Sequence, residues 1–290
     1  MKDAVKHIVK KILMYLPGKL YVKLKGLYVL RYWMNIKEPK TFNEKINHRK
    51  FYIENELYAL CADKVAVREY VRKIAGNKYL VPVIFIGGSI TAEQLESYGV
   101  GFVAKTTHDS GNVHIVNSIN ADYNKICKSL MSGLQSDYSK EYYEWWYEEI
   151  YPQIIVEKLL LMEDGSLPVD YKFHVFNRQG KSKIIVQIDY DRFTNHNRSF
   201  YDEDLKLLKF SNNFPSLDKV IVDKPGNFPR MIKLASELAA DFDYVRVDLF
   251  NVNGEVYFGE LTFAHASGWG RFIPAKYDLL LGTYWDVKKQ

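Results

Sequence analysis

The sequence is poor in cysteine and lacks any long apolar run. Its 290 residues include two cysteines, Cys61 and Cys127, which lie far apart and show no spacing typical of a zinc or redox site. A disulfide framework and a structural zinc site are therefore not expected. No stretch reaches the roughly 18 apolar residues of a membrane span, and lysines interrupt the first 30 residues, unlike a signal peptide. We expect the protein to stay in the cytoplasm.

Strong net charge is also absent outside the N-terminal segment. The formal net charge is +5, but residues 1–35 contain eight Lys or Arg and one Asp, a net of +7, so residues 36–290 sum to −2. The body of the protein therefore gives no reason to expect nucleic-acid binding. Residues 1–35 are predicted to be a basic amphipathic helical segment, because apolar residues recur at helical spacing between lysines. Such a segment either packs on the body with its lysines in water, the reading we favour, or contacts an anionic membrane surface.

The remaining sequence mixes helical and strand patterns without repeats. With 47% hydrophobic residues, it can bury a large core. Helices are predicted over 39–51, 63–73, 90–98, 121–150 and 224–240, and strands over 79–86, 102–105, 113–116, 154–160, 170–176, 183–189, 245–250 and 256–262. This order indicates an α+β protein.

The two strands near the C-terminus are where we expect the chemistry. Asp248 and Glu260 each stand among apolar residues, where an unpaired charge is costly to bury, so a cation should neutralise them. A two-residue Asn-Gly turn would place them on opposite faces. A three-residue loop with Gly254 as a bulge pairs Arg246 with Glu260 and puts Arg246, Asp248 and Glu260 on one face. Oxygen ligands beside a cation suit Mg²⁺, but an ordinary hairpin with solvated carboxylates is an equal alternative from these residues alone.

Three other segments carry weaker signals. The polar loop 106–112 follows Lys105 and could cradle phosphates, although a plain hairpin turn explains it equally simply. Lys64 belongs to a basic row on the predicted helix 63–73, and such a row is usually a solvated face. Residues 190–204 are predicted to be a long polar loop, a kind of segment that often carries function.

Seven segments together resemble the TupA-like branch of the ATP-grasp superfamily, whose proteins are linked to bacterial cell-surface polysaccharide biosynthesis. The segments are PKTFNEKI (39–46), ADKVAVREYV (62–71), FVAKTTHDSGN (102–112), VEKLL (156–160), DYKFHVFN (170–177), DRFTNH (191–196) and VRVDLFNVNGEVYFGELTF (245–263). The resemblance implies an α+β ATP-grasp fold, with an N-terminal α/β subdomain and two α+β subdomains that clamp ATP. We expect the basic segment at 1–35, the N-terminal subdomain at 36–100, the small ATP-grasp subdomain at 101–158, and the large one, with the metal site, at 159–290.

The resemblance also implies roles for individual residues. Lys64 and Lys105 would contact the phosphates of ATP, and the loop containing Ser110 and Gly111 would close over them. Glu157, Lys158 and the backbone near Leu159 would meet adenine. Asp170 would accept from the ribose, with Lys172 close by. Asp248 and Glu260 would bind Mg²⁺, Arg246 would face the transferred phosphate, and Arg192 or His196 would help to hold the γ-phosphate or the acceptor.

Two departures from the family pattern concern this site. Thr262 stands where many superfamily members have Asn, so a second Mg²⁺ would be held differently. Asp109 stands in a loop that is often richer in glycine, where it could repel phosphate or displace the loop.

The chemistry implied by the resemblance is amide formation through an acyl phosphate. A carboxylate attacks the γ-phosphate of ATP, and an amine then displaces phosphate. A uronic acid of a glycan or lipid-linked glycan and an amino acid would be the natural pair of substrates. Two other activities stay open: a sugar or glycan kinase on the same scaffold, and a metal-dependent glycosyltransferase using residues 189–191 or 241–243. A non-catalytic nucleotide-binding protein and a peripheral position at the inner face of the membrane also stay open.

Overall fold

The computed structural model describes residues 16–190, 195–217 and 224–287. The helices are α2 (Gly18–Val29), α3 (Phe42–Tyr52), α4 (Glu56–Ala62), α5 (Val67–Ala75), α6 (Ala92–Ser97), α7 (Tyr123–Gly133), α8 (Tyr138–Tyr142), α9 (Phe228–Leu238) and α10 (Lys276–Thr283), with short 3-10 turns η1 (Asn77–Tyr79), η2 (Trp145–Tyr147) and η3 (His265–Gly268). The strands are β1 (Val83–Gly87), β2 (Phe102–Thr106), β3 (Val113–Val116), β4 (Ile154–Lys158), β5 (Asp170–Arg178), β6 (Lys181–Tyr190), β7 (Asn197–Tyr201), β8 (Leu207–Leu208), β9 (Ser211–Asn212), β10 (Tyr244–Val252), β11 (Glu255–Thr262) and β12 (Phe272–Ile273).

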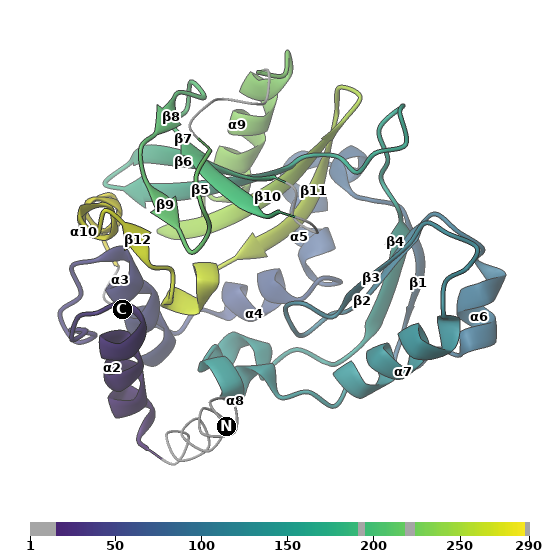
Figure 1. The fold of residues 1–290 in the computed structure, drawn as a ribbon, viewed down its shortest axis with the longest axis horizontal. Helices are drawn as coiled ribbons and strands as arrows, with labels where there is room; N and C mark the ends of the chain where they lie inside the picture. The colour runs from purple at the N-terminus through teal and green to yellow at the C-terminus, as the bar shows by residue number, and fades with distance from the viewer. Residues whose placement is uncertain (1–15, 191–194, 218–223, 288–290) are drawn as a thin grey trace.

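The larger sheet is antiparallel and has six strands in the order β11-β10-β5-β6-β7-β8. Alternation of side chains sends Val245, Val247 and Leu249 of β10 to one face, where they join the main apolar core. Helix α9 covers this face (Figure 1), and its Met231 and Leu234 belong to the same core. The opposite face of the same strands is left for the polar residues of β5, β6, β10 and β11.

The smaller sheet has four strands in the order β1-β4-β2-β3. Leu95 of α6 and Leu130 of α7 pack with Phe102 and Val156 of the strands in a separate apolar cluster. Strand β1 pairs with β4, so this sheet extends across the predicted subdomain boundary at residue 100. The division of the chain into subdomains otherwise stays a prediction.

Helix α3 is polar in sequence but lies in the interior. It begins with a capping box, in which the Thr41 side chain accepts from the backbone of Glu44 and the Glu44 side chain accepts from the backbone of Thr41. The buried guanidinium of Arg49 donates to Asp243 at 2.5 Å and to the carbonyl of Phe263 at 2.8 Å. Buried polar groups need such partners, so these bonds fix α3 against the large sheet.

Several sequence-based boundaries are corrected by the structure. The predicted helix 121–150 is interrupted, because α7 ends near Gly133 and Tyr143 adopts a left-handed conformation with φ of 57°. The helix predicted at 63–73 begins only at Val67, which leaves Lys64 in the preceding turn. Part of the predicted loop 190–204 is a strand, β7, because residues 197–201 pair with β6.

The N-terminal prediction is covered only in part. Residues 1–15, where much of the basic helical segment was predicted, lie outside the described residues. Helix α2 follows them and ends at Val29, where Arg31 takes a φ of 70°. Within the described ranges, no helix combines the length and apolar content that a membrane span requires.

Candidate functional site

The hairpin of β10 and β11 brings its two carboxylates together, by a route that differs from the predicted one. Val252 pairs with Glu255, so the turn has two residues, Asn253 and Gly254, both with positive φ. The predicted three-residue loop is therefore wrong, and so is the predicted pairing within the strands. Asp248 instead pairs directly with Glu260.

A β-bulge at Gly259 produces this pairing. Leu249 pairs with Phe258 and Asp248 with Glu260, so Gly259 is the extra residue on β11. A Cβ atom at Gly259 would lie 3.1 Å from the backbone oxygen of Asp248, which favours glycine there. The bulge reverses the alternation after the turn, and the prediction that Asp248 and Glu260 share one face is confirmed.

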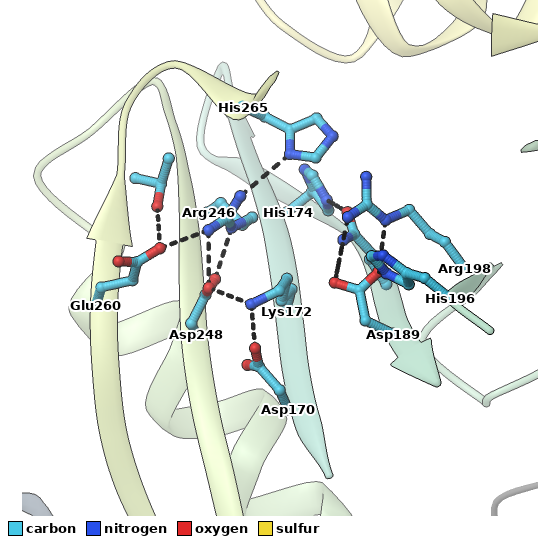
Figure 2. Close-up of polar contacts among 12 residues, drawn as sticks. Asp170, Lys172, His174, Asp189, His196, Arg198, Arg246, Asp248, Glu260 and His265 are labelled. Atoms are coloured by element: carbon cyan, nitrogen blue, oxygen red, sulfur yellow. Dashed lines mark hydrogen bonds and ion pairs between the residues drawn. The ribbon is translucent and has the colours of Figure 1, made fainter. Parts of the chain in front are cut away.

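Arg246 joins the two carboxylates. Its guanidinium donates to Asp248 through Nε at 2.6 Å and through Nη2 at 2.8 Å, and Nη2 also donates to Glu260 at 2.6 Å (Figure 2). Lys172 of β5 donates to Asp248 at 2.6 Å and contacts Asp170 as well. Both cations therefore lie where the sequence required neutralisation of buried carboxylates.

The two carboxylates differ in their environment. Asp248 is buried, and burial raises its pKa to about 6 even though Arg246 and Lys172 act in the opposite direction. The side chain of Glu260 is 45% exposed, and Arg246 followed by Lys172 outweighs the effect of burial and holds its pKa at about 2. Glu260 is thus the more accessible anion of the pair.

The oxygen donors at this point suit a hard divalent cation. Two carboxylates lie opposite each other, and the Thr262 hydroxyl donates to Glu260 Oε1 at 3.0 Å. Mg²⁺ commonly takes one or two protein carboxylates and completes its shell with water and substrate phosphates, so Asp248 and Glu260 fit it. Within the described ranges, no group of three or more His, Cys, Asp or Glu side chains forms a metal site. The assignment of Mg²⁺ to these residues stays a prediction.

His265 was missed by the sequence reasoning. Arg246 Nη1 lies 3.2 Å from His265 Nδ1, and burial together with His174 and Arg246 lowers the pKa of His265 well below its usual value. The ring is therefore neutral, and its Nδ1 accepts from the guanidinium. His265 lies in η3, where Ala266 and Ser267 have positive φ. No periodicity marks such a turn, so the sequence contained no signal for this contact.

A buried polar chain continues from this cluster across the sheet. His174 of β5 contacts the hydroxyl of Tyr244 and Gln187 of β6, each at 3.0 Å, and Gln187 donates to Asp189 at 3.0 Å. Lys172, opposite Gln187, lies on the same face. His174 and Gln187 were also missed, although strand alternation from Lys172 and Asp189 would have placed them on this face.

His196, which was predicted to hold the γ-phosphate or the acceptor, lies at the end of that chain beside Arg198, which had been assigned no role. His196 contacts Asp189 at 3.0 Å, and Arg198 donates to the same carboxylate at 2.6 Å. Burial raises the pKa of Asp189, but the hydrogen bond and positive charge of Arg198 lower it by more. The net result is a pKa well below the usual range. Arg192 lies outside the described residues, as does Asp191 of the glycosyltransferase alternative.

The predicted adenine residues lie on and after β4. Glu157 accepts from Lys105 at 2.7 Å and from Arg68 at 2.8 Å, so its carboxylate holds two cations. The backbone N–H of Leu159 donates to Gly101, and that of Lys158 donates to Pro82. The structure thus brings Lys105 and Glu157 together, while the N–H groups of Lys158 and Leu159 already have protein partners.

Lys64 contacts the loop predicted to hold phosphates. Its ammonium donates to the backbone oxygen of Asp109 at 2.5 Å and lies 3.8 Å from the Asp109 carboxylate. Burial lowers the pKa of Lys64, and Asp109 followed by Glu260 acts against that effect. Ser110 and Gly111 are exposed at the tip of the loop. Lys64, the loop and Glu260 therefore lie close enough for their charges to interact.

Two surface hollows lie elsewhere in the described structure. One lies over α10, from Lys276 to Thr283, and the other lies between β3 and α7. Neither is lined by a residue of the predicted ATP or metal site.

Comparison with known proteins identifies the family. The model of the family described as TupA-like ATPgrasp matches residues 44–286, well over half of the chain. No curated protein sequence matches. The solved structures that are similar include D-alanine–D-alanine ligase from Helicobacter pylori, with 11% identity, a TM-score of 0.43, and coverage of 83% of this chain and 68% of that one.

In two other similar structures, the match covers a smaller share of the solved protein. An L-amino acid ligase from Bacillus licheniformis has 10% identity, a TM-score of 0.47, and coverage of 91% of this chain and 58% of that one. Phosphoribosylamine–glycine ligase from Thermotoga maritima has 12% identity, a TM-score of 0.43, and coverage of 73% and 50%. The chain thus spans between half and about two thirds of the length of these three structures, and the family assignment rests on the family match. With its mixed helices and antiparallel sheets, the chain belongs to the TupA-like ATP-grasp family.

Proposed function

We propose that this protein is a carboxylate–amine ligase that attaches an amino acid to a uronic acid of a bacterial surface polysaccharide or of its lipid-linked precursor. Its family is one of ATP-dependent ligases, which supports ATP as the co-substrate. The observation that carries the proposal is the cluster of Arg246, Asp248, Glu260 and Lys172 on one face of the large sheet. It combines two hard oxygen ligands with two fixed cations, the set that phosphoryl transfer requires.

The residues of the cluster have distinct roles in this proposal. Mg²⁺, when bound, supplies charge neutralisation to the phosphates, and Asp248 and Glu260 are the residues that hold it. Arg246 donates to the oxygens of the transferred phosphoryl group, where negative charge is concentrated. Lys172 keeps its charge, because Asp170 and Asp248 outweigh the effect of burial and raise its pKa. The charged Lys172 then holds Asp248 as an anion.

The acceptor side is assigned to the other end of the polar chain. Arg198 and His196 are oriented by Asp189 on the same face of the sheet as Asp248. A uronic acid offers a carboxylate and several hydroxyl groups, and such a substrate matches a guanidinium and an imidazole. Once the carboxylate has been phosphorylated, an amine attacks its carbonyl carbon, the C–O bond to phosphate breaks, and inorganic phosphate leaves.

The glycosyltransferase alternative that uses residues 241–243 is not supported by the positions of their carboxylates. Asp243 is buried and accepts from Arg49 and from the indole N–H of Trp285 at 2.8 Å. Asp241 accepts from the Tyr70 hydroxyl at 3.1 Å. Both carboxylates therefore serve packing between elements, away from the cluster around Arg246.

The test measures inorganic phosphate and amide product with ATP, Mg²⁺, uronic acids and amino acids. We expect phosphate release that requires both a carboxylate and an amine, and loss of at least about a hundredfold in Asp248→Asn and Glu260→Gln, the scale for removing a group that stabilises the transition state. Asp241→Asn serves as the matched control, because it removes one carboxylate remote from the cluster. Release of ADP without phosphate would instead identify a kinase, and wild-type turnover in both variants would exclude the metal assignment.

A further inference from the structure

Helix α2 presents several apolar side chains outward. Helix α2 buries Tyr21 and Val22 against the body. On its other side Leu27 is 49% exposed and Tyr28 is 68% exposed, and Leu20 is exposed seven residues before Leu27. Residues seven and eight apart share one face of a helix, so these three side chains form one stripe. A surface helix normally presents polar residues there, and a contiguous apolar surface marks an interaction site.

Aromatic residues next to α2 extend this stripe. The chain turns after Leu30, where Arg31 has a positive φ, and Met34 returns against Gly26 so closely that a Cβ at Gly26 would lie 2.5 Å from Met34. The turn leaves Trp33 beside the helix and 52% exposed. Tyr52, at the end of α3, is exposed as well.

Basic groups lie over these aromatic rings. The ammonium of Lys19 is 4.1 Å from the centre of the Tyr52 ring, and that of Lys23 is 5.9 Å from the Trp33 ring. The guanidinium of Arg31 lies 5.7 Å from the Tyr28 ring. The sequence from 18 to 37 contains five Lys or Arg and no Asp or Glu. We define the α2 surface as these side chains together: Lys19, Leu20, Lys23, Leu27, Tyr28, Arg31, Trp33 and Tyr52.

We propose that the α2 surface docks the protein on an anionic lipid bilayer. Leucine, tryptophan and tyrosine side chains enter the boundary between headgroups and acyl chains, and lysine and arginine pair with anionic headgroups. A nucleic acid would satisfy the charges but offers no medium in which Leu20 and Leu27 lose contact with water. Residues 36–290 carry a net charge of −2, so an anionic surface attracts the N-terminal segment and repels the rest.

The position of α2 agrees with a role separate from catalysis. The family match begins at residue 44, after α2 and the turn that follows it. Figure 1 shows α2 at the edge of the molecule beside α3, while β10 and β11, which carry Asp248 and Glu260, lie in the large sheet. A bilayer bound through α2 therefore does not have to contact the carboxylate cluster.

The experiment is vesicle flotation of the full chain without ATP. Vesicles of phosphatidylcholine are compared with vesicles that contain about 30 mol% phosphatidylglycerol, and we expect at least about tenfold stronger binding to the anionic vesicles, which falls as salt is raised. Leu27→Gln/Tyr28→Gln should reduce binding about tenfold, because it removes the apolar contact and leaves the charges. Lys19→Gln/Lys23→Gln should reduce binding to anionic vesicles and abolish much of the salt dependence.

Control variants remove exposed apolar or charged side chains elsewhere. Leu279 and Leu280 of α10 are exposed to a similar extent, so Leu279→Gln/Leu280→Gln controls for loss of exposed leucine. Lys206→Gln/Lys209→Gln controls for loss of two positive charges. Both control variants should bind vesicles as the wild type does. Equal losses in test and control variants, no binding to anionic vesicles, or a dimer in sedimentation that only Leu27→Gln/Tyr28→Gln disrupts would overturn the proposal.

Discussion

Asp109 forms an ion pair with Lys64, the lysine that is predicted to contact the phosphates of ATP. The Asp109 carboxylate lies 3.8 Å from Lys64, and the two side chains are only 9% and 12% exposed. We predict that Asp109→Asn lowers the KM for ATP, because a phosphate that approaches Lys64 no longer competes with a carboxylate on the same loop. The backbone bond from Lys64 to Asp109 at 2.5 Å does not depend on the side chain and should persist.

The size of the effect follows from the geometry. Two unit charges about 4 Å apart interact by roughly 4 kcal/mol at an effective dielectric constant of about 20. Desolvation of both groups cancels most of this energy, so a net of about 1 kcal/mol is expected for the ion pair. That energy corresponds to a decrease in the KM for ATP of about fivefold. The kcat should stay within about twofold, because Asp109 is assigned no contact with the reacting atoms.

The assay is phosphate release at saturating acceptor and amine, with ATP varied. Asp109→Glu keeps the charge and should keep the wild-type KM. Asp137→Asn removes an exposed carboxylate that pairs with Lys140 and should change neither parameter. An unchanged or higher KM for ATP in Asp109→Asn would refute the reasoning, since it would show that the carboxylate does not compete with phosphate.

Three further predictions concern buried groups around the hairpin. His265→Ala should lower kcat about tenfold or more while leaving the KM for ATP nearly unchanged, because Arg246 loses the acceptor that orients it. His265→Asn returns an acceptor near the position of Nδ1 and should restore part of the rate. Equal rates in the two variants would contradict this role. Burial, followed by the charge of Arg246, lowers the pKa of His174 to about 3 in the folded protein. As the pH falls below about 6.5, His174 is therefore protonated in the unfolded chain but stays neutral in the folded one. Stability should therefore fall by about 2 kcal/mol between pH 7 and pH 5 on account of this group, and urea unfolding of His174→Gln should show that much less pH dependence. Gly259→Ala should destabilise the fold by about 1 to 2 kcal/mol in urea, because its Cβ would crowd the Asp248 carbonyl, whereas Gly88→Ala, where the added Cβ meets nothing within 4 Å, should be neutral.

Local patterns predicted the strands of the large sheet well. Lys172 and Asp248 were placed on strands because apolar residues alternate around them, and the pairing of Asp248 with Lys172 across β10 and β5 places them on one face. The capping pattern at Thr41 and Glu44 likewise begins a helix. The same local rules failed between 121 and 150, where a continuous helix was predicted, whereas α7 ends at Gly133 and Tyr143 is left-handed.

The hairpin shows a limit of such rules in more detail. The prediction that Arg246, Asp248 and Glu260 share a face was confirmed, but it rested on the wrong loop length. Turn chemistry favours a two-residue Asn-Gly connection, and the structure has it. The compensating bulge at Gly259 depends on how β11 packs beside β10, and a single glycine in a strand is not enough to predict it.

The sequence by itself determined the elements that local chemistry controls: the alternation of β5 and β10, the cap of α3, the basic N-terminal segment, and the charges that a buried hairpin must neutralise. Only the tertiary structure decided which cation meets which carboxylate. Lys172 contacts Asp248, His265 contacts Arg246, and Asp109 pairs with Lys64. The order of the strands and the positions of the loops bring together these residues, which are between 19 and 76 positions apart in the sequence. Periodicity extends over a few residues, whereas such contacts depend on how separate elements pack, and that is why the assembled site could not be read from the chain.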